Sequence, residues 1–310
     1  MNELQQQVED LRMYQLSDWK LASDNYAALG QTQTRMFETN DFRIVLQYNP
    51  ERIRSSAAKI DAASLQKRPC FFCNRPEEQQ SILYRDSFRI LVNPYPIFEK
   101  HFTIPALWHD KQQILPYYED MLSLAADLSD YVIFYNGPKC GASAPDHMHF
   151  QAVGAGSLPI EWNWRKALKE IVWKGEATTL YALDNFLSPV FMLASSRWDE
   201  AVKVFEMLYA RLEIKEGDYE PMMNIVTWME EGVWYSFIFP RKELRPSCFY
   251  AAEPDNILIS PATVEMAGFF VAPLEKDFQK ITAKDLECIL KEVAITKEQK
   301  DEIVRKIRAL

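Results

Sequence analysis

The spacing of hydrophobic residues predicts a mixed chain in which helices alternate with short strands. Residues 3–29 carry apolar side chains at helical intervals and predict one helix or two short ones. A further helix is expected to begin near Pro116, since proline suits a first helical turn. Short apolar or alternating runs in the first half predict strands at residues 42–48, 88–92, 101–104, 131–135 and 147–153.

The second half repeats this order of elements. A helix is expected from about Trp198, and residues 284–310 predict two short amphipathic helices. Strands are predicted at residues 180–183, 190–193, 223–228 and 233–239. This agreement between the halves indicates an internal duplication. We therefore expect an α+β fold of two tandem lobes, residues 1–158 and 159–310, each an antiparallel sheet packed with helices.

Composition narrows the class of protein. Hydrophobic residues make up 48% of the 310 residues and charged residues 25%, which is normal for a soluble globular protein. The net charge of −9 argues against non-specific binding to nucleic acid. The sequence has neither a long apolar run nor a secretory signal at its polar N-terminus. We therefore expect a cytoplasmic protein without membrane or nucleic-acid partners, and composition leaves its oligomeric state open.

A pair of histidines in the strand at 147–153 is the first candidate for chemistry. Alternate residues of a strand share a face, so His147, His149 and Gln151 are expected to project together. An imidazole is largely neutral at pH 7 and can attack phosphorus without a separate base. The loop at 141–143 (Gly-Ala-Ser) offers backbone and hydroxyl donors for phosphate oxygens. Two surface histidines without a role are the alternative.

The segment around these histidines resembles a known signature. Residues 141–151, Gly-Ala-Ser-Ala-Pro-Asp-His-Met-His-Phe-Gln, resemble the motif of the histidine-triad (HIT) superfamily in its transferase branch, His-x-His-x-Gln. That branch includes galactose-1-phosphate uridylyltransferase, diadenosine tetraphosphate phosphorylase and the GDP-L-galactose phosphorylase family. The sequence His-Met-His-Phe-Gln at residues 147–151 is most similar to that of the GDP-L-galactose phosphorylase family. The resemblance is sharp over residues 88–153 and looser in the second half.

This resemblance implies roles for individual residues. His149 matches the family's nucleophile, and Gln151 matches the glutamine that holds the nucleotidyl phosphate and marks transfer over hydrolysis. Asn136 and Ser143 match positions that bond the α-phosphate. Asp146 departs from relatives that have proline directly before the first histidine, which leaves the geometry of the loop and the role of Ser143 open.

Three further residues are candidates for binding the substrate. Lys139 and Gly141 lie in the loop before the motif, where a cation and a backbone N–H can contact phosphate. Arg241 follows the strand that corresponds to the histidine strand in the second half. Its charge is suited to phosphoryl transfer, and a solvated surface cation is an equal alternative.

The cysteines indicate a metal site. Their number, five, is odd, so a disulfide framework is not expected. Cys70 and Cys73 form a Cys-x-x-Cys that can supply two thiolates. A redox pair would need a thioredoxin-like βαβ context, which is not evident in the sequence, and two buried, inert cysteines are the other alternative. The resemblance implies a structural zinc held by Cys70, Cys73, His109 and His147. His101 is the alternative to His109, which we favour.

Together these features predict a nucleotidyltransferase or phosphorylase with a ping-pong mechanism. The resemblance implies a substrate that is a nucleoside diphosphate compound, with a GDP-hexose as one candidate. Phosphate or a sugar phosphate is the expected acceptor. One alternative is a HIT-type hydrolase of dinucleoside polyphosphates or nucleotidyl conjugates. The other is a zinc-stabilised nucleotide-binding protein without catalysis.

Overall fold

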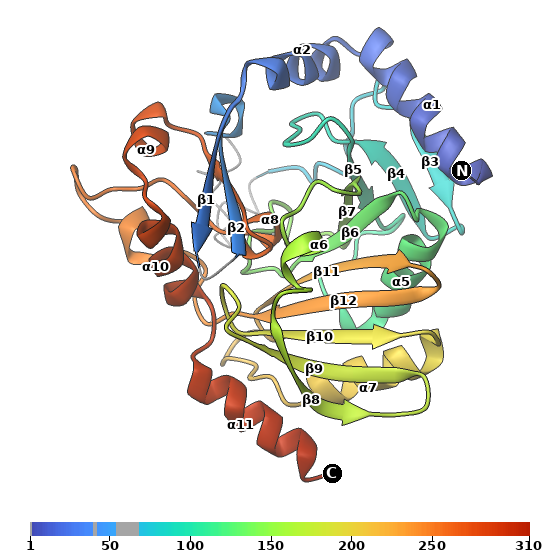
Figure 1. Ribbon diagram of the computed structural model, residues 1–310. Helices are drawn as coiled ribbons and strands as arrows, with labels where there is room; N and C mark the ends of the chain where they lie inside the picture. The colour runs from blue at the N-terminus through green and yellow to red at the C-terminus, as the bar shows by residue number, and fades with distance from the viewer. Residues whose placement is uncertain (1, 40–41, 54–67) are drawn as a thin grey trace.

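A ten-stranded antiparallel sheet forms the centre of the molecule (Figure 1). The computed structural model describes residues 2–39, 42–53 and 68–310. The first half of the chain contributes β3 (Ser81–Tyr84), β4 (Phe88–Val92), β5 (His101–Pro105), β6 (Tyr131–Asn136) and β7 (His149–Gly154). The second half contributes β8 (Leu168–Lys174), β9 (Thr178–Asp184), β10 (Val190–Ser195), β11 (Met223–Glu230) and β12 (Val233–Pro240).

Both halves arrange their strands in the same way. The order across the sheet is β3-β4-β5-β7-β6 followed by β11-β12-β10-β9-β8, so each half places its fifth strand between its third and fourth. The two halves meet edge to edge through β6 and β11, where Phe134 is paired with Val226. The predicted α+β class is therefore confirmed, with the two antiparallel sheets joined into one. The boundary between residues 158 and 159 stays a prediction.

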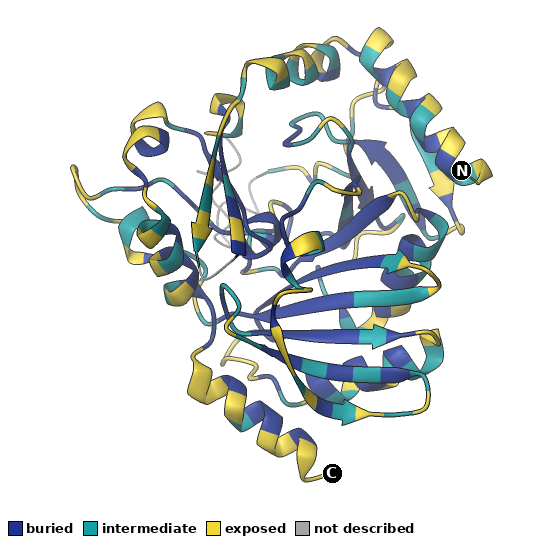
Figure 2. Ribbon diagram, viewed as in Figure 1, coloured by how far each residue is buried: buried dark blue, intermediate teal, exposed yellow. Residues whose placement is uncertain are grey.

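One face of the large sheet is covered by helices. These are α5 (Tyr118–Asp127) and α7 (Trp198–Tyr209), one from each half, with α1 (Glu3–Asp18) and α11 (Lys297–Arg308) at the two ends. The ring of Tyr118 stacks on that of Phe205, with centroids 3.8 Å apart and planes 13° apart. Figure 2 shows the sheet-facing sides of α5 and α7 as buried. The two helices thus join the halves on this face as β6 and β11 do within the sheet.

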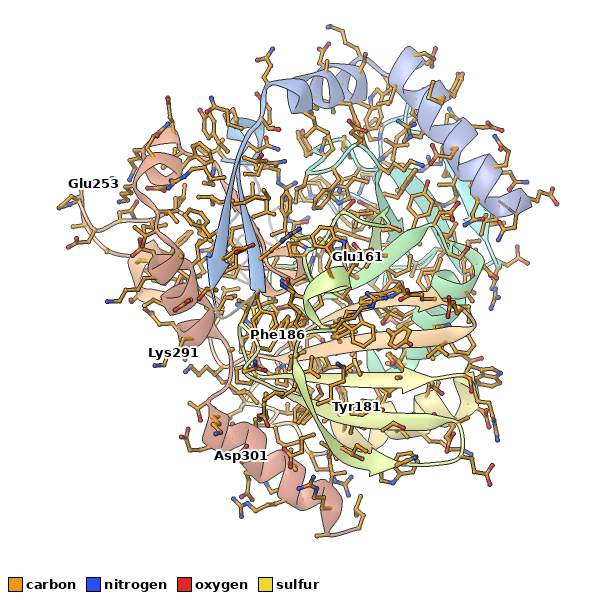
Figure 3. All side chains as sticks on the ribbon, viewed as in Figure 1. Glu161, Tyr181, Phe186, Glu253, Lys291 and Asp301 are labelled. Carbon is orange, nitrogen blue, oxygen red and sulfur yellow. The ribbon has the colours of Figure 1, made fainter. Side chains whose placement is uncertain are left out.

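A small sheet and short helices cover the opposite face. The small sheet contains β1 (Gln33–Thr39), β2 (Phe42–Tyr48) and β13 (Phe269–Ala272), which runs parallel to β2. Beside it lie α8 (Thr263–Met266), α9 (Glu275–Lys280) and α10 (Ala283–Val293). Phe42 meets Phe186, labelled in Figure 3, edge to face at 5.0 Å. This layer packs on Phe134 and Val153, so it lies over the same sheet face as residues 149 and 151.

The remaining elements are short and connect these layers. They are α2 (Lys20–Ala28), α6 (Ile160–Asn163) and the 3₁₀ turns η1 (Leu29–Gln31), η2 (Pro50–Arg52), η3 (Leu115–Tyr117) and η4 (Ser247–Phe249). No helix in the described ranges is both long and apolar enough to cross a membrane.

Most of the predicted elements are present. The strands expected at 88–92 and 101–104 are present and pair with each other, with Leu91 opposite Thr103. Four strands were not predicted: β1, β3, β8 and β13. β1 and β8 are largely solvent-exposed, so they show no clear apolar pattern.

One predicted boundary is wrong. The strand expected from residue 147 begins at His149, and His147 lies in the preceding turn. The backbone N–H of Met148 donates to the carbonyl of Asp110 at 2.7 Å, and that of His147 to Ala144 at 3.2 Å. These bonds keep residues 147 and 148 out of the pairing between β6 and β7.

The contact between α5 and α7 predicts the effect of a single substitution. We expect Phe205→Ala to lower the free energy of unfolding by about 3–5 kcal/mol, because it removes a fully buried ring and leaves a cavity. Urea unfolding measures this change. Glu206→Ala, at an exposed position on the same helix, is the matched control and is expected to change stability little. Equal stabilities of the two variants would contradict the packing described.

Candidate active site and metal site

His149 is the first residue of β7, and its side chain is held in one tautomer. Its Nδ1 lies 2.8 Å from the carbonyl oxygen of His147. Because a carbonyl can only accept, Nδ1 carries the hydrogen and the neutral ring has its lone pair on Nε2. Burial lowers the pKa of His149 to about 4. No hydrogen bond to Nε2 forms within the part of the chain that the structure describes. His149 therefore has the electronic form of a nucleophile.

The backbone of His149 is clamped by a buried amide. The Oε1 atom of Gln112 accepts the backbone N–H of His149 at 2.8 Å, and its Nε2 atom donates to the His149 carbonyl at 3.0 Å. The same Nε2 donates to the carbonyl of Asn136 at 2.9 Å. The last residue pair between β6 and β7 is Phe134 with Gln151. Beyond it, the Gln112 side chain supplies the hydrogen bonds that direct pairing of the two strands would otherwise make. Gln112 fixes His149 where these strands separate.

Gln151 follows His149 on the same face of β7. Its Oε1 atom lies 2.8 Å from Nε2 of His101, which is fully buried on β5. No partner for the Gln151 amide nitrogen is found among the described residues. His101 is thus engaged with Gln151 and is not among the residues of the metal cluster.

A candidate metal site lies directly beside His149. It consists of Cys70, Cys73, His109 and His147, whose ligand atoms all lie within 4.8 Å of one another. The Nδ1 atom of His147 lies 3.2 Å from Sγ of Cys70 and 3.6 Å from Sγ of Cys73. The Nδ1 atom of His109 lies 3.3 Å from Sγ of Cys73. The preference for His109 over His101 in this cluster therefore agrees with the structure.

The donor set fits a tetrahedral zinc ion. Zn–S bonds of about 2.3 Å and Zn–N bonds of about 2.0 Å place neighbouring S and N ligands about 3.6 Å apart. The observed S–N separations of 3.2 to 3.6 Å are close to this value. The Nε2 atom of His147 lies 2.9 Å from the carbonyl oxygen of Ala106, so Nε2 carries the hydrogen and Nδ1 presents its lone pair. A metal-bound histidine commonly donates its other N–H in this way.

Phe72, between the two cysteines, connects the metal cluster with His149. Its ring centroid lies 5.2 Å from that of His147 and 5.0 Å from that of His149. The Cys-x-x-Cys loop therefore packs against both histidines. Any change in the position of this loop is transmitted to His149 by direct contact.

Asn136 is the last residue of β6, and Gln112 donates to its carbonyl as well as to that of His149. The Oδ1 atom of Asn136 accepts hydrogen bonds from the backbone and hydroxyl of Thr263 at 2.9 and 2.8 Å. Its Nδ2 atom is left without a partner in the described ranges, so it is free to donate to a phosphate oxygen. Gly141 has φ +97°, and a Cβ there would lie 2.4 Å from that of Ala262. Ser143 is exposed, and its carbonyl accepts from Arg68 at 3.2 Å.

The two predicted cations are engaged elsewhere. Lys139 pairs with Asp218. Arg241 is buried, so the solvated surface cation considered for it is wrong. Its guanidinium donates to Asn224 Oδ1 at 2.7 Å, and Asn224 in turn donates to Asn136 Oδ1 at 3.2 Å. Arg241 is thereby connected to Asn136 through one side chain.

Asp146, the departure from the family motif, has a partner of its own. One carboxylate oxygen accepts from Arg68 at 3.0 Å, and the other lies 4.0 Å from Nε2 of His109. Arg68 also stacks over the ring of Phe71 at 4.2 Å. Asp146 therefore connects the motif loop to the segment that carries the cysteines.

Sequence reasoning did not find Gln112, Phe72 or Arg68. Gln112 lies in a polar stretch, His109 to Gln113, that matches no motif, and its partners are backbone groups from distant elements. Phe72 was detectable in principle, because a large apolar residue between two metal ligands must pack against something near the metal.

Comparison with a solved structure identifies the architecture. The crystal structure of a yeast Ap4A phosphorylase matches with a TM-score of 0.53 and 14% identity, covering 89% of this chain and 94% of that one. The two proteins share a fold. The fold implied by the sequence resemblance is thus confirmed.

A family model and two further solved structures also match the chain. The model of DUF4922, a domain of unknown function, matches residues 11–154. A DUF4931 family protein from Bacillus cereus matches at a TM-score of 0.42 and 16% identity, covering 55% of this chain and 89% of that one. An ADP-glucose phosphorylase from Arabidopsis thaliana matches at a TM-score of 0.38 and 14% identity, covering 85% and 100%. No curated protein sequence matches the chain.

The cysteine–histidine cluster predicts a bound metal. We expect purified protein to contain about one zinc per chain, because four ligands in this arrangement complete a tetrahedral site. Elemental analysis measures it. Cys73→Ser is expected to lose most of the zinc and to melt at a lower temperature, whereas Cys288→Ser, at another exposed free cysteine, is expected to retain it. Folded wild-type protein without zinc would contradict the site.

The buried amide of Gln112 predicts a second effect. We expect Gln112→Glu to lower the free energy of unfolding by about 1–3 kcal/mol, because a carboxylate oxygen then faces the carbonyls of Asn136 and His149. The amide hydrogen of His149 is also expected to exchange faster with solvent. Urea unfolding and hydrogen exchange measure the two effects. Gln80→Glu, at an exposed position, is the control. A Gln112→Glu variant as stable as this control would refute the clamp.

Proposed function

We propose that this protein transfers nucleotidyl groups, with His149 as the residue that becomes covalently modified. The observation that carries the proposal is the hydrogen bond from His149 Nδ1 to the His147 carbonyl, which leaves a lone pair on Nε2. The fold shared with an Ap4A phosphorylase supports it. So does the presence of Gln151 where HIT hydrolases have a third histidine.

The reaction follows from these groups in two steps. In the first, Nε2 of His149 attacks the α-phosphorus of a nucleoside diphosphate compound, an N–P bond forms, and the bond to the leaving phosphate group breaks. No proton has to be removed from the nucleophile, because Nε2 carries none. In the second, an oxygen of phosphate or of a sugar phosphate attacks the same phosphorus, and the N–P bond breaks. His149 is then restored.

Charge is balanced by groups around His149. The ring becomes cationic when Nε2 is bonded to phosphorus, and the acceptor oxygen of His147 opposite Nδ1 stabilises that charge. The free amide nitrogens of Asn136 and Gln151 donate to the non-bridging oxygens. Lys139 and Gly141 border the loop, and Ser143 lies farther out on its exposed side. Arg241 does not contact the phosphate directly; it orients Asn136 through a hydrogen bond to Asn224.

A bound zinc would hold the site in place and take no part in bond making. Cys70, Cys73, His109 and His147 would be its ligands, and His147 would then be fixed at both ring nitrogens. Its carbonyl, which determines the tautomer of His149, would be fixed with it. This gives the metal a structural function in keeping with a site closed by four protein ligands.

The first substrate to test is chosen from the resemblance of the sequence motif. The wording His-Met-His-Phe-Gln resembles the GDP-L-galactose phosphorylase family, so a GDP-hexose with phosphate as acceptor is the first pair to test. The solved structures compared above include phosphorylases of Ap4A and of ADP-glucose, so these two compounds are the second and third.

Covalent labelling tests the proposal. Protein is incubated without acceptor with GDP-, ADP- and UDP-hexoses and diadenosine tetraphosphate, each carrying ³²P at the α-phosphorus. We expect label on the wild type that is stable in base and lost in acid, as for a phosphoramidate, and none on His149→Ala. Glu206→Ala is the folded control.

Two results would overturn parts of the proposal. Failure of every compound to label the wild type would refute the covalent intermediate and favour a binding protein. Release of free nucleotide at the same rate with and without phosphate would refute phosphorolysis and favour a hydrolase.

A further inference from the structure

His101 is a buried histidine for which neither the motif nor the metal cluster provides a function. It is the first residue of β5, is fully buried, and lies opposite Val153 of β7. It contacts the rings of Phe98 and Phe134, with centroids 6.3 and 6.2 Å away. A buried imidazole among apolar rings is retained only where both ring nitrogens find partners.

The backbone determines which ring nitrogen of His101 carries the hydrogen. The N–H of Ile97 donates to Nδ1 at 3.1 Å. A backbone N–H can only donate, so Nδ1 holds a lone pair. A neutral imidazole has one N–H, which must therefore be on Nε2. Protonation of the ring would turn Nδ1 into a donor facing a donor. Burial, together with the charge of Arg52, lowers the pKa of His101 to about 3.

This tautomer in turn fixes the amide of Gln151. Nε2 of His101 lies 2.8 Å from the side chain of Gln151, and because it donates, the atom opposite it must be the amide oxygen. The amide nitrogen of Gln151 then has to point away from His101. The opposite orientation would place N–H against N–H.

Asn93 is the other side chain near Nε2 of His101, and it does not accept the hydrogen of that nitrogen. Its Nδ2 atom lies 3.4 Å from Nε2 of His101, but both atoms carry hydrogens, so this contact is not a hydrogen bond. Asn93 is oriented by other partners: its Oδ1 accepts the N–H of Tyr95 at 2.9 Å, and its Nδ2 donates to Thr103 at 3.0 Å. It therefore cannot turn an acceptor toward His101, and Gln151 is the sole acceptor for that N–H in the described residues.

We propose that His101 is a positioning residue that holds Gln151 as a hydrogen-bond donor toward the phosphoryl oxygens of the group carried by His149. The proposal rests on the nucleotidyl transfer proposed above. Gln151 lies two positions after His149 on one strand, so both side chains share a face. A negatively charged phosphoryl oxygen requires a donor. A freely rotating amide would present its oxygen part of the time and repel the same group.

Two substitutions at His101 separate hydrogen bonding from packing. His101→Phe keeps a ring and removes the N–H, whereas His101→Gln retains an amide donor near the position of Nε2. With the best-labelled nucleotide, we expect His101→Phe to reduce kcat about 10- to 100-fold with little change in KM. This is less than the roughly 100- to 1000-fold cost of removing a transition-state donor, because the Gln151 amide is still present. His101→Gln is expected to recover most of that loss. Equal activity of His101→Phe and wild type would overturn the proposal.

A double-mutant cycle tests whether His101 acts through Gln151. In the Gln151→Ala background, His101→Phe is expected to have no further effect, because the amide to be oriented is absent. Gln151→Glu is expected to lose as much activity as Gln151→Ala, since a carboxylate still accepts from His101 but offers no donor to phosphate. Losses that multiply in the double variant would show that His101 acts by another route. Melting temperatures of all variants verify that they are folded.

A measurement on the free protein tests the inference without any activity. The chain has only four histidines, so their ¹⁵N resonances can be assigned by single substitutions. At pH 7 we expect His101 in the form with hydrogen on Nε2, hydrogen-bonded and slow to exchange. Hydrogen on Nδ1, or rapid exchange between the two forms, would overturn the proposal.

The two proposals can fail separately. If no nucleotide labels the wild type, nucleotidyl transfer fails, and the function of His101 is then decided by binding. In that case we expect a nucleoside monophosphate to bind His101→Phe about tenfold more weakly than wild type, which corresponds to about 1.4 kcal/mol. Equal affinity, or loss of affinity in His101→Gln as large as in His101→Phe, would overturn it.

Discussion

The hydrogen bond from His149 Nδ1 to the carbonyl of His147 is the interaction on which the site depends. It determines the tautomer of His149, and its geometry is set by groups on either side. On one side, the ring of His147 is held by the Ala106 carbonyl and faces the two thiols. On the other, Gln112 holds the backbone of His149. His147, in the turn before β7, and His149, the first residue of β7, are thus fixed independently, and the bond between them follows.

The same reasoning applies to three of the four histidines. In each, a backbone group of unambiguous polarity meets one ring nitrogen: the carbonyls of Ala106 and His147 require a hydrogen, and the N–H of Ile97 requires a lone pair. The other ring nitrogen is then available: Nε2 of His149 has a lone pair, Nδ1 of His147 faces the thiols, and Nε2 of His101 donates to Gln151. Backbone hydrogen bonds therefore determine which ring nitrogen of each of these histidines carries the hydrogen.

The sequence predicts those parts of the molecule that local pattern determines. The strands at 88–92 and 101–104 are short segments rich in apolar and β-branched residues, and the cluster of cysteines and histidines was predicted from a short motif together with a family resemblance. Edge strands such as β1 and β8 face solvent on both sides for most of their length and carry no such pattern. Hydrogen bonds between residues far apart in the sequence could not be predicted either. Nothing near Gln112 indicates that its amide would bond to Asn136 and His149, which lie 24 and 37 residues further along the chain.

The pairing of β6 with β11 joins two halves of the same strand order in an antiparallel register. That is the geometry in which two identical five-stranded units associate about a two-fold axis. The molecule thus corresponds to a symmetric dimer whose two units are covalently connected. Association of the two units therefore does not depend on protein concentration. All four histidines lie in the first half of the chain, and the second half has none. The face that corresponds to the site is filled there by aromatic rings, with Trp228 stacked on Phe237 at 5.0 Å. The first half thus carries the candidate site, and the second half covers the edge of β6 that a partner subunit would otherwise have to cover.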